Sequence, residues 1–195
     1  MDNVIIYFLG FPGVGKYTIA KKVSDLNKDF LLIDNHKTNN LLFPLINLDQ
    51  PIPDEFWDIV IKIRENVFEA IEKFYDPKKS LIFTNALYEN DTIDRSVYNR
   101  IETLAKQRKS LFIPIRLNCT TEELKKRIGN PDRKELYKIT SSAYIDNLII
   151  GNKKVIITNH PNEINVDVTN LSVEESIKVV WEGIENLVID KKQSS

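Results

Sequence analysis

The sequence predicts an α/β domain, a three-layer sandwich in which a five-stranded parallel sheet lies between two layers of helices. Strand-like segments alternate with helix-like segments along the chain, as parallel strands with helical crossovers require. A glycine-rich turn follows the first predicted strand and opens the first predicted helix. At 195 residues the chain has the length of one such domain with a substantial core, so we expect a single domain over residues 1–195.

Each predicted strand is a short segment rich in apolar residues. The five are Val4–Leu9, Phe30–Ile33, Leu81–Thr84, Leu111–Leu117 and Val166–Thr169. All but the last are near-continuous apolar runs, as expected for strands that helices cover on both faces.

The predicted helices carry apolar residues at the 3.6-residue period of an amphipathic helix. Their stripes run through Ile19 and Val23, from Phe56 to Phe74, through Val97 and Ile101, and from Val173 to Leu187. The longest is predicted to span Pro53 to Phe74. Two capping boxes predict helix starts, Thr120 with Glu123 and Ser172 with Glu175.

Two segments do not fit this alternation. Residues 35–53 form a long connection after the second predicted strand, and residues 127–152 form a polar, basic excursion after the fourth. Long connections of this kind in a compact domain are often lids or binding loops.

Composition restricts the class of protein. Lys and Arg number 27 against 28 Asp and Glu, so nothing in the total charge indicates nucleic-acid binding. The single cysteine, Cys119, cannot form an internal disulfide and fits a reducing compartment. The apolar N-terminal run is too short to span a membrane. We therefore expect a cytoplasmic protein; the sequence leaves its oligomeric state open.

The stretch GFPGVGKYT, residues 10–18, fits the phosphate-loop pattern G-x-x-x-x-G-K-[S/T] up to its last position. Tyr17 stands where a hydroxyl residue is expected, and Thr18 comes one place later. Glycines allow backbone N–H groups to surround phosphate oxygens, and Lys16 would reach the β- and γ-phosphates. An ordinary glycine turn would explain the glycines but not Lys16. The predicted nucleotide-binding residues are Gly10, Pro12, Gly13, Val14, Gly15, Lys16, Tyr17 and Thr18.

The pattern G-x-P-G-x-G-K-x-T of residues 10–18 resembles the phosphate loop of adenylate kinase and its relatives, the shikimate, gluconate and chloramphenicol kinases. The loop, together with the D-N-H of residues 34–36, also resembles a bacterial ATP-binding family described as shikimate-kinase-like. The resemblance implies a P-loop nucleotide-kinase type of fold with a short lid, and the use of ATP and Mg²⁺. It further implies that Thr18 touches phosphate and helps to hold Mg²⁺, since adenylate kinases commonly place threonine one residue late.

Other P-loop classes fit poorly. A small GTPase needs an N-K-x-D, which the strings NKDF and NKKV do not supply. A motor-type ATPase would end a strand in Asp-Glu, whereas the third predicted strand leads into Asn85, and a neutral amide is a poor Mg²⁺ ligand. This pattern counts against hydrolysis-driven machines.

Asp34 ends the second predicted strand, where α/β sheets place ligands. In shikimate-kinase-like enzymes an aspartate here contacts the acceptor hydroxyl or helps to hold Mg²⁺, so we predict a catalytic and metal-binding role for Asp34. A helix or turn cap is the alternative. Asn35 and His36 are predicted to contact the acceptor, although His36 is as readily structural.

Basic and amide side chains elsewhere complete the predicted site. Arg64 flanks the apolar stripe of the long helix, and related kinases use such an arginine for an anionic group of the acceptor; a surface arginine is the alternative. Asn85 is predicted to line the acceptor pocket. Arg127 and Arg133 lie in the predicted lid, where arginine suits phosphate, with a solvated charged helix as the competing interpretation.

The sequence thus predicts an ATP-dependent phosphotransferase that moves a γ-phosphoryl group to a hydroxyl or phosphate of a small molecule. Residues 35–75 would bind the acceptor, and residues 127–152 would form the lid. The alternative is a nucleotide-binding regulatory or interaction protein with little or no kinase activity, which Tyr17 and Asn85 motivate. The sequence does not identify the acceptor.

Overall fold

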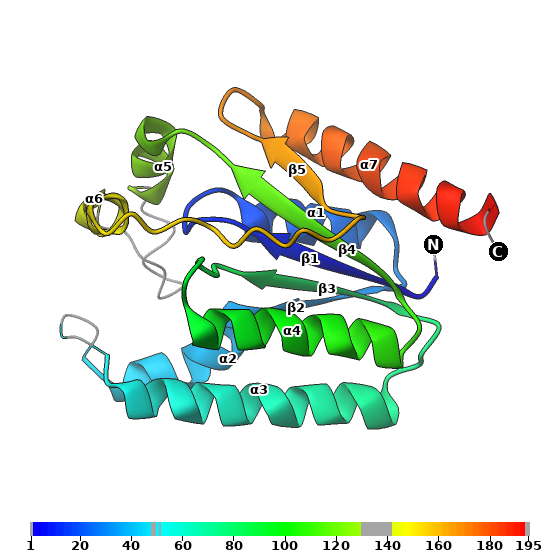
Figure 1. Cartoon of the computed structure of the whole chain (residues 1–195), viewed down its shortest axis with the longest axis horizontal. Helices are drawn as coiled ribbons and strands as arrows, with labels where there is room; N and C mark the ends of the chain where they lie inside the picture. The colour runs from blue at the N-terminus through cyan, green and yellow to red at the C-terminus, as the bar shows by residue number, and fades with distance from the viewer. Residues whose placement is uncertain (1, 48–49, 51, 130–141, 194–195) are drawn as a thin grey trace.

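The computed structural model of the protein describes residues 2–47, 50, 52–129 and 142–193. Its centre is a five-stranded sheet in the order β2-β3-β1-β4-β5, and every adjacent pair is parallel (Figure 1). The strands are β1 Val4–Leu9, β2 Phe30–Asp34, β3 Ser80–Asn85, β4 Leu111–Asn118 and β5 Ile164–Asp167. All five predicted strands are present, and the largest boundary difference is the two-residue shift of β5.

Side chains of β1 alternate between the two faces of the sheet and are buried on both. Ile6 and Phe8 share one cluster with Val23 of α1 and Val180 of α7. Their neighbours on the other face pack against α3 and α4. The buried, near-continuous apolar strand and its two helical layers are the predicted three-layer sandwich.

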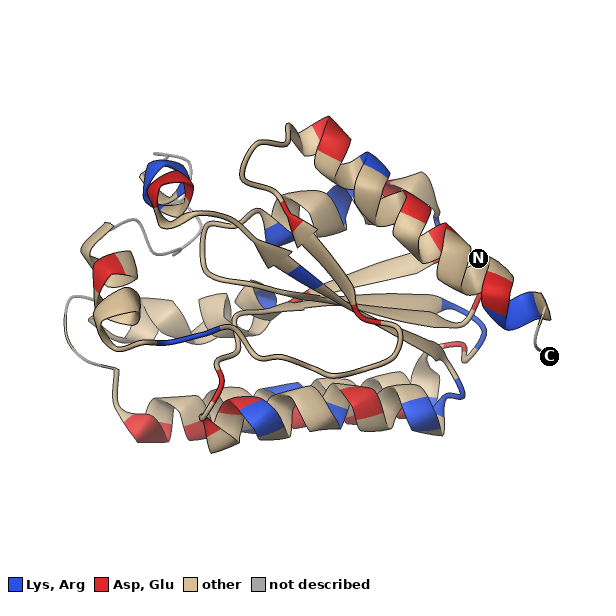
Figure 2. Cartoon of the chain, turned by 45° about the horizontal axis from the view of Figure 1, so that its top comes forward, with Lys and Arg blue, Asp and Glu red and all other residues tan. Residues whose placement is uncertain are grey.

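The helices have well-marked limits in the structure. They are α1 Lys16–Leu26, α2 Asn35–Leu42, α3 Asp54–Phe74, α4 Thr92–Gln107, α5 Thr121–Ile128, α6 Ser142–Ile150 and α7 Val173–Gln193, with a 3₁₀ turn at Phe43–Leu45. Acidic and basic residues are interspersed along α3 and α7, so these two surfaces carry no uniform charge (Figure 2). No helix in the described part of the chain is long and apolar enough to cross a membrane.

The segment predicted as a long connection after β2 contains α2 and the 3₁₀ turn, and this helix was missed. The buried residues of α2 are polar, Thr38 and Asn39, so the sequence shows no apolar stripe there. Both accept hydrogen bonds from Arg64 of α3. The buried face of α2 is therefore fixed by hydrogen bonds from Arg64 and not by apolar packing.

Of the two predicted capping boxes, one forms in full. The Ser172 N–H donates to Glu175 Oε2 at 2.8 Å, and the Glu175 N–H donates to Ser172 Oγ at 3.1 Å. At the start of α5 only half forms: the Glu123 N–H donates to Thr120 Oγ1 at 3.4 Å. The Glu123 carboxylate turns to Arg127 instead, so the prediction of a reciprocal box there is wrong.

Candidate nucleotide- and acceptor-binding site

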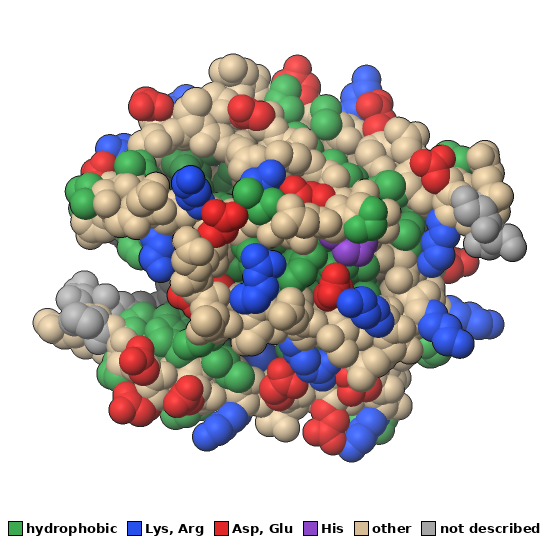
Figure 3. Space-filling model, viewed as in Figure 1, with side chains coloured by type: hydrophobic (Ala, Val, Ile, Leu, Met, Phe, Trp, Pro, Cys, Tyr) green, Lys and Arg blue, Asp and Glu red, His purple; other side chains and the backbone are tan. Residues whose placement is uncertain are grey.

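A cavity of about 1270 Å³ lies at the carboxyl edge of the sheet. Residues 12–19 form one wall, and the ends of β2 and β3 form its floor. Helix α3 lines one side, and α6 and the start of α7 line the other. In the space-filling view the molecule is hollowed at the left, between α6 and the N-terminal end of α3 (Figure 3). Ligands of open α/β sheets bind at this edge.

The loop after β1 has a backbone that glycine alone accommodates. A Cβ at Gly10 would lie 2.6 Å from the carbonyl oxygen of Leu117 on the neighbouring strand. Gly15, which precedes α1, has φ of 107°, a conformation that residues with a Cβ rarely adopt. The first helical bond of α1 runs from the Ile19 N–H to the Gly15 carbonyl at 3.0 Å. The N–H groups before it form the positive end of α1 and face the cavity.

The side chain of Lys16 folds back over its own loop. Its Nζ donates to the carbonyl of Gly10 at 2.8 Å and to that of Phe11 at 2.9 Å. The ammonium group is therefore held across the loop, at the cavity wall. Tyr17 and Thr18 follow on the exposed first turn of α1 and line the same wall.

Asp34 ends β2 beside Thr84 of β3, its partner in the sheet register. Its side chain is buried, with 4% exposed, and its Oδ1 accepts a hydrogen bond from the Thr84 hydroxyl. It occupies the N-cap position of α2 but makes no side-chain capping hydrogen bond. The alternative of a helix cap therefore does not explain Asp34. Asn35 and His36 follow in the first turn of α2 and line the cavity.

Asn85 ends β3, next along the chain from Thr84, and faces the cavity. Only 6% of the residue is exposed. Within the described ranges its side-chain amide has no hydrogen-bond partner. The amide has one acceptor and two donors, so it suits a ligand-binding role at the cavity.

Arg64 reaches the cavity from α3. Its Nε donates to Thr38 Oγ1 at 3.4 Å and its Nη2 to Asn39 Oδ1 at 2.9 Å. Burial lowers the pKa of its guanidinium. The structure thus places Arg64 against α2 and the cavity rather than on the outer surface.

Asp94, in the first turn of α4, lines the cavity and was missed by the sequence analysis. Its Oδ2 accepts a hydrogen bond of 2.7 Å from the Tyr88 N–H. Burial, followed by Asp91, raises its pKa to about 6, although the Tyr88 amide, Lys153 and Arg64 act in the opposite direction. The string DTID looks like an ordinary helix start, with Asp91 accepting hydrogen bonds from the N–H groups of residues 93 and 94, and this concealed a second role for Asp94.

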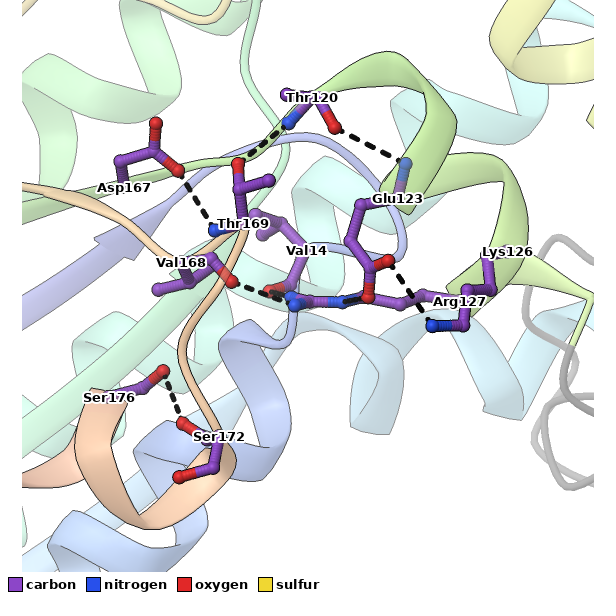
Figure 4. Close-up of polar contacts among 10 residues, drawn as sticks. All are labelled: Val14, Thr120, Glu123, Lys126, Arg127, Asp167, Val168, Thr169, Ser172 and Ser176. Atoms are coloured by element: carbon purple, nitrogen blue, oxygen red, sulfur yellow. Dashed lines mark hydrogen bonds and ion pairs between the residues drawn. The ribbon is translucent and has the colours of Figure 1, made fainter.

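Arg127 connects three segments at the edge of the cavity (Figure 4). Its Nη1 donates to the carbonyl of Val14 in the loop at 3.1 Å, and its Nη2 to the carbonyl of Val168 after β5 at 2.8 Å. Its Nε donates to Glu123 at 2.8 Å. Arg133 lies outside the described residues.

Several solved kinases share this chain trace. A gluconokinase from Sinorhizobium meliloti matches with a TM-score of 0.66 at 12% identity, over 99% of this chain and 98% of that chain. A thymidylate kinase from Candida albicans matches with 0.60 at 16% identity, over 95% and 92%. A sugar kinase from a Janibacter species matches with 0.60 at 15% identity, over 94% and 95%. No protein-family model and no curated protein matches the chain.

The fold is that of the P-loop nucleotide and small-molecule kinases, as the resemblance of the loop implied. At these identities the likeness concerns the fold alone, so activity must be inferred from the cavity and its side chains.

Proposed function

We propose that the protein is an ATP- and Mg²⁺-dependent phosphotransferase that acts on a small-molecule acceptor. One observation supports this most strongly: the loop at the positive end of α1 and the polar ends of β2 and β3 open on the same cavity. A nucleotide phosphate and an acceptor group could therefore meet there, which is the first requirement for phosphoryl transfer.

The nucleotide end consists of residues 10–18. The loop N–H groups and the N-terminus of α1 would bind the β- and γ-phosphates, and Lys16 would neutralise their charge. Lys16 already lies at the cavity wall, held by carbonyls of its own loop.

The residues present fit a Mg²⁺ ion that phosphate oxygens and water help to hold. Thr18 and Asp34 supply oxygen atoms on two sides of the cavity, and hard cations of this kind bind oxygen ligands. In the described part of the chain no three His, Cys, Asp or Glu side chains group into a metal site of their own. When bound, the ion would neutralise charge on the β- and γ-phosphates.

At the acceptor end, Asp34 would orient the hydroxyl or take its proton, and Asn85 would hydrogen-bond the acceptor. Asn35, His36 and Arg64 complete this proposed subsite, which falls mainly within residues 35–75. The buried Asp34 carboxylate, fixed by Thr84, suits a positioning role because its orientation is set before the acceptor binds.

Arg127 and Arg133 are proposed to stabilise the transferred phosphoryl group, with residues 127–152 as the lid. The Arg127 guanidinium uses three of its five donors, for Glu123 and for the carbonyls of Val14 and Val168. One N–H on each Nη atom therefore remains for a phosphate oxygen.

Replacing Lys16 tests the proposal. We expect Lys16→Ala to abolish transfer from [γ-³²P]ATP to a small-molecule extract while leaving the melting temperature within a few degrees of wild type. Lys22→Ala, an exposed lysine of the same helix, is the matched control and should retain full activity. Transfer by Lys16→Ala at the wild-type rate would reject the proposal.

A nucleotide-binding regulatory protein remains the second candidate, because Tyr17 replaces the expected hydroxyl and Asn85 replaces a strand-end acid. Calorimetry with ATP separates the two when combined with the transfer assay. Tight, Mg²⁺-independent binding without any transfer would favour the regulatory protein.

A further inference from the structure

Hydrogen-bond acceptors gather where the ends of β2 and β3 and the start of α4 line the cavity, which is the acceptor end of the proposed site. Asp94 uses only its Oδ2, for the Tyr88 N–H, and within the described residues its Oδ1 has no hydrogen-bond partner. Asn85, only 6% exposed as a residue, lines the same cavity and can both accept and donate hydrogen bonds. Asp34 uses one oxygen for Thr84. A ligand placed here meets carboxylate oxygens that, when ionised, can only accept hydrogen bonds.

The charges at this end are predominantly negative. The described lining of the whole cavity carries the carboxylates of Asp34, Asp54, Asp58, Asp91 and Asp94 and the cations Lys16, Arg64, Arg127 and Lys153. Because the proposed function assigns Lys16 and Arg127 to the phosphates of ATP, Arg64 and Lys153 are the cations that remain for the acceptor.

Both cations already make contacts, and each keeps N–H donors that these contacts do not use. Arg64 donates to Thr38 and Asn39. Lys153 lies 4.0 Å from the Asp91 carboxylate, with its Nζ 5.7 Å from the centre of the Tyr88 ring. A carboxylate or phosphate of an acceptor would still meet five lining carboxylates against these two cations, which is unfavourable.

An apolar wall stands beside these groups. Phe43 of the 3₁₀ turn and Trp57 and Val60 of α3 line the cavity and belong to one small apolar cluster. The Trp57 ring packs edge-on against Phe43, with ring centroids 6.4 Å apart, so it is held in place. Binding pockets commonly combine such a surface with a few polar groups that fix orientation.

We propose that the acceptor is a neutral or cationic compound rich in hydroxyl or amine donors, which form hydrogen bonds with Asp94 and Asn85. Anionic acceptors such as nucleotides and sugar acids would then bind poorly at this end of the cavity. The inference rests on the proposed phosphotransferase function and narrows it. Two features favour donors over anions: the Asp94 Oδ1 atom can only accept a hydrogen bond when the carboxylate is ionised, and an added negative charge would meet carboxylates.

Whether the acceptor is anionic can be tested before the acceptor itself is identified. A deproteinised cell extract is passed over a strong anion exchanger at pH 8, and both the unretained and the eluted fractions are incubated with the protein and [γ-³²P]ATP. Label in products other than ATP and phosphate is measured, with Lys16→Ala as the blank. We expect Lys16-dependent product mainly from the unretained, neutral and cationic fraction.

Product mainly from the retained anions would overturn the inference while leaving the proposed phosphotransferase intact. Lack of Lys16-dependent product from both fractions would overturn both.

Asp94→Asn tests the residue itself. Asparagine has the same shape and can still accept from the Tyr88 N–H, but it lacks the carboxylate. We expect kcat/KM for the unretained fraction to fall about ten- to a hundredfold, the range for a lost hydrogen bond to a charged group. Glu102→Gln, which removes a carboxylate from the outer side of the same helix, should leave kcat/KM unchanged. Equal activity of Asp94→Asn and Glu102→Gln would contradict the assignment of Asp94.

Discussion

Arg127 offers a quantitative test of how the phosphate loop is held. Arg127→Met keeps much of the side-chain bulk but removes the hydrogen bonds to the carbonyls of Val14 and Val168 and the ion pair with Glu123. Hydrogen bonds from charged donors contribute about 1.5–3 kcal/mol each. Since the side chain is 25% exposed, we take the lower value for each carbonyl, which gives a loss of about 3 kcal/mol in the free energy of unfolding.

Urea unfolding of three variants separates the contributions. Glu123→Gln removes the ion pairs of Glu123 with Arg127 and with Lys126 but keeps the carbonyl contacts of Arg127, so it should cost much less than Arg127→Met, because partly exposed pairs contribute little. Lys126→Met, next to Arg127 but 80% exposed, should be nearly neutral. If Arg127→Met costs no more than Glu123→Gln, the carbonyl contacts do not stabilise the loop and the reasoning is refuted.

Three further predictions follow from single side chains. Gly10→Ala should destabilise the protein and weaken ATP binding at least tenfold by calorimetry, because its Cβ would overlap the Leu117 carbonyl; unchanged binding would contradict the assigned loop geometry. Asp34→Asn should lower kcat more than ATP affinity, and a fall in ATP affinity alone would reject its role at the acceptor. Asp94→Asn should melt at a higher temperature than wild type at pH 8 and at the same temperature near pH 4. The reason is that burial raises the pKa of Asp94 from 3.8 to about 6, so its ionised form costs stability above that pH. The charged groups that act on Asp94 are Asp91, which strengthens this effect, and Lys153 and Arg64, which weaken it. Scanning calorimetry across this pH range checks the sign, and a lower melting temperature for Asp94→Asn at pH 8 would contradict it.

The sheet and its helical layers could be predicted because their signals are local. Buried apolar runs and 3.6-residue stripes lie within single segments, and β1 and α3 match them closely. Helix α2 could not be predicted in this way, because its buried side chains are polar and their partner, Arg64, lies in another helix.

The nucleotide end of the proposed site has a local sequence signal, whereas the acceptor end depends on contacts between distant segments. The predicted phosphate loop is continuous in the sequence, so its glycines and Lys16 were enough to predict it. Asp94 reaches the cavity only because the fold brings the start of α4 beside Arg64 and Lys153, and no spacing in the sequence records that approach. The partner of Arg127 in the loop, the Val14 carbonyl, is a backbone atom and leaves no sequence signal.

The central claim is that the loop at the start of α1 binds the phosphates of ATP. A crystal structure of the protein with ATP and Mg²⁺ tests this claim most directly. We predict β- and γ-phosphate oxygens within hydrogen-bonding distance of Lys16 Nζ and of the backbone N–H groups of residues 13–18. Phosphates bound elsewhere, with Lys16 Nζ still donating to the Gly10 and Phe11 carbonyls and to no phosphate oxygen, would contradict it.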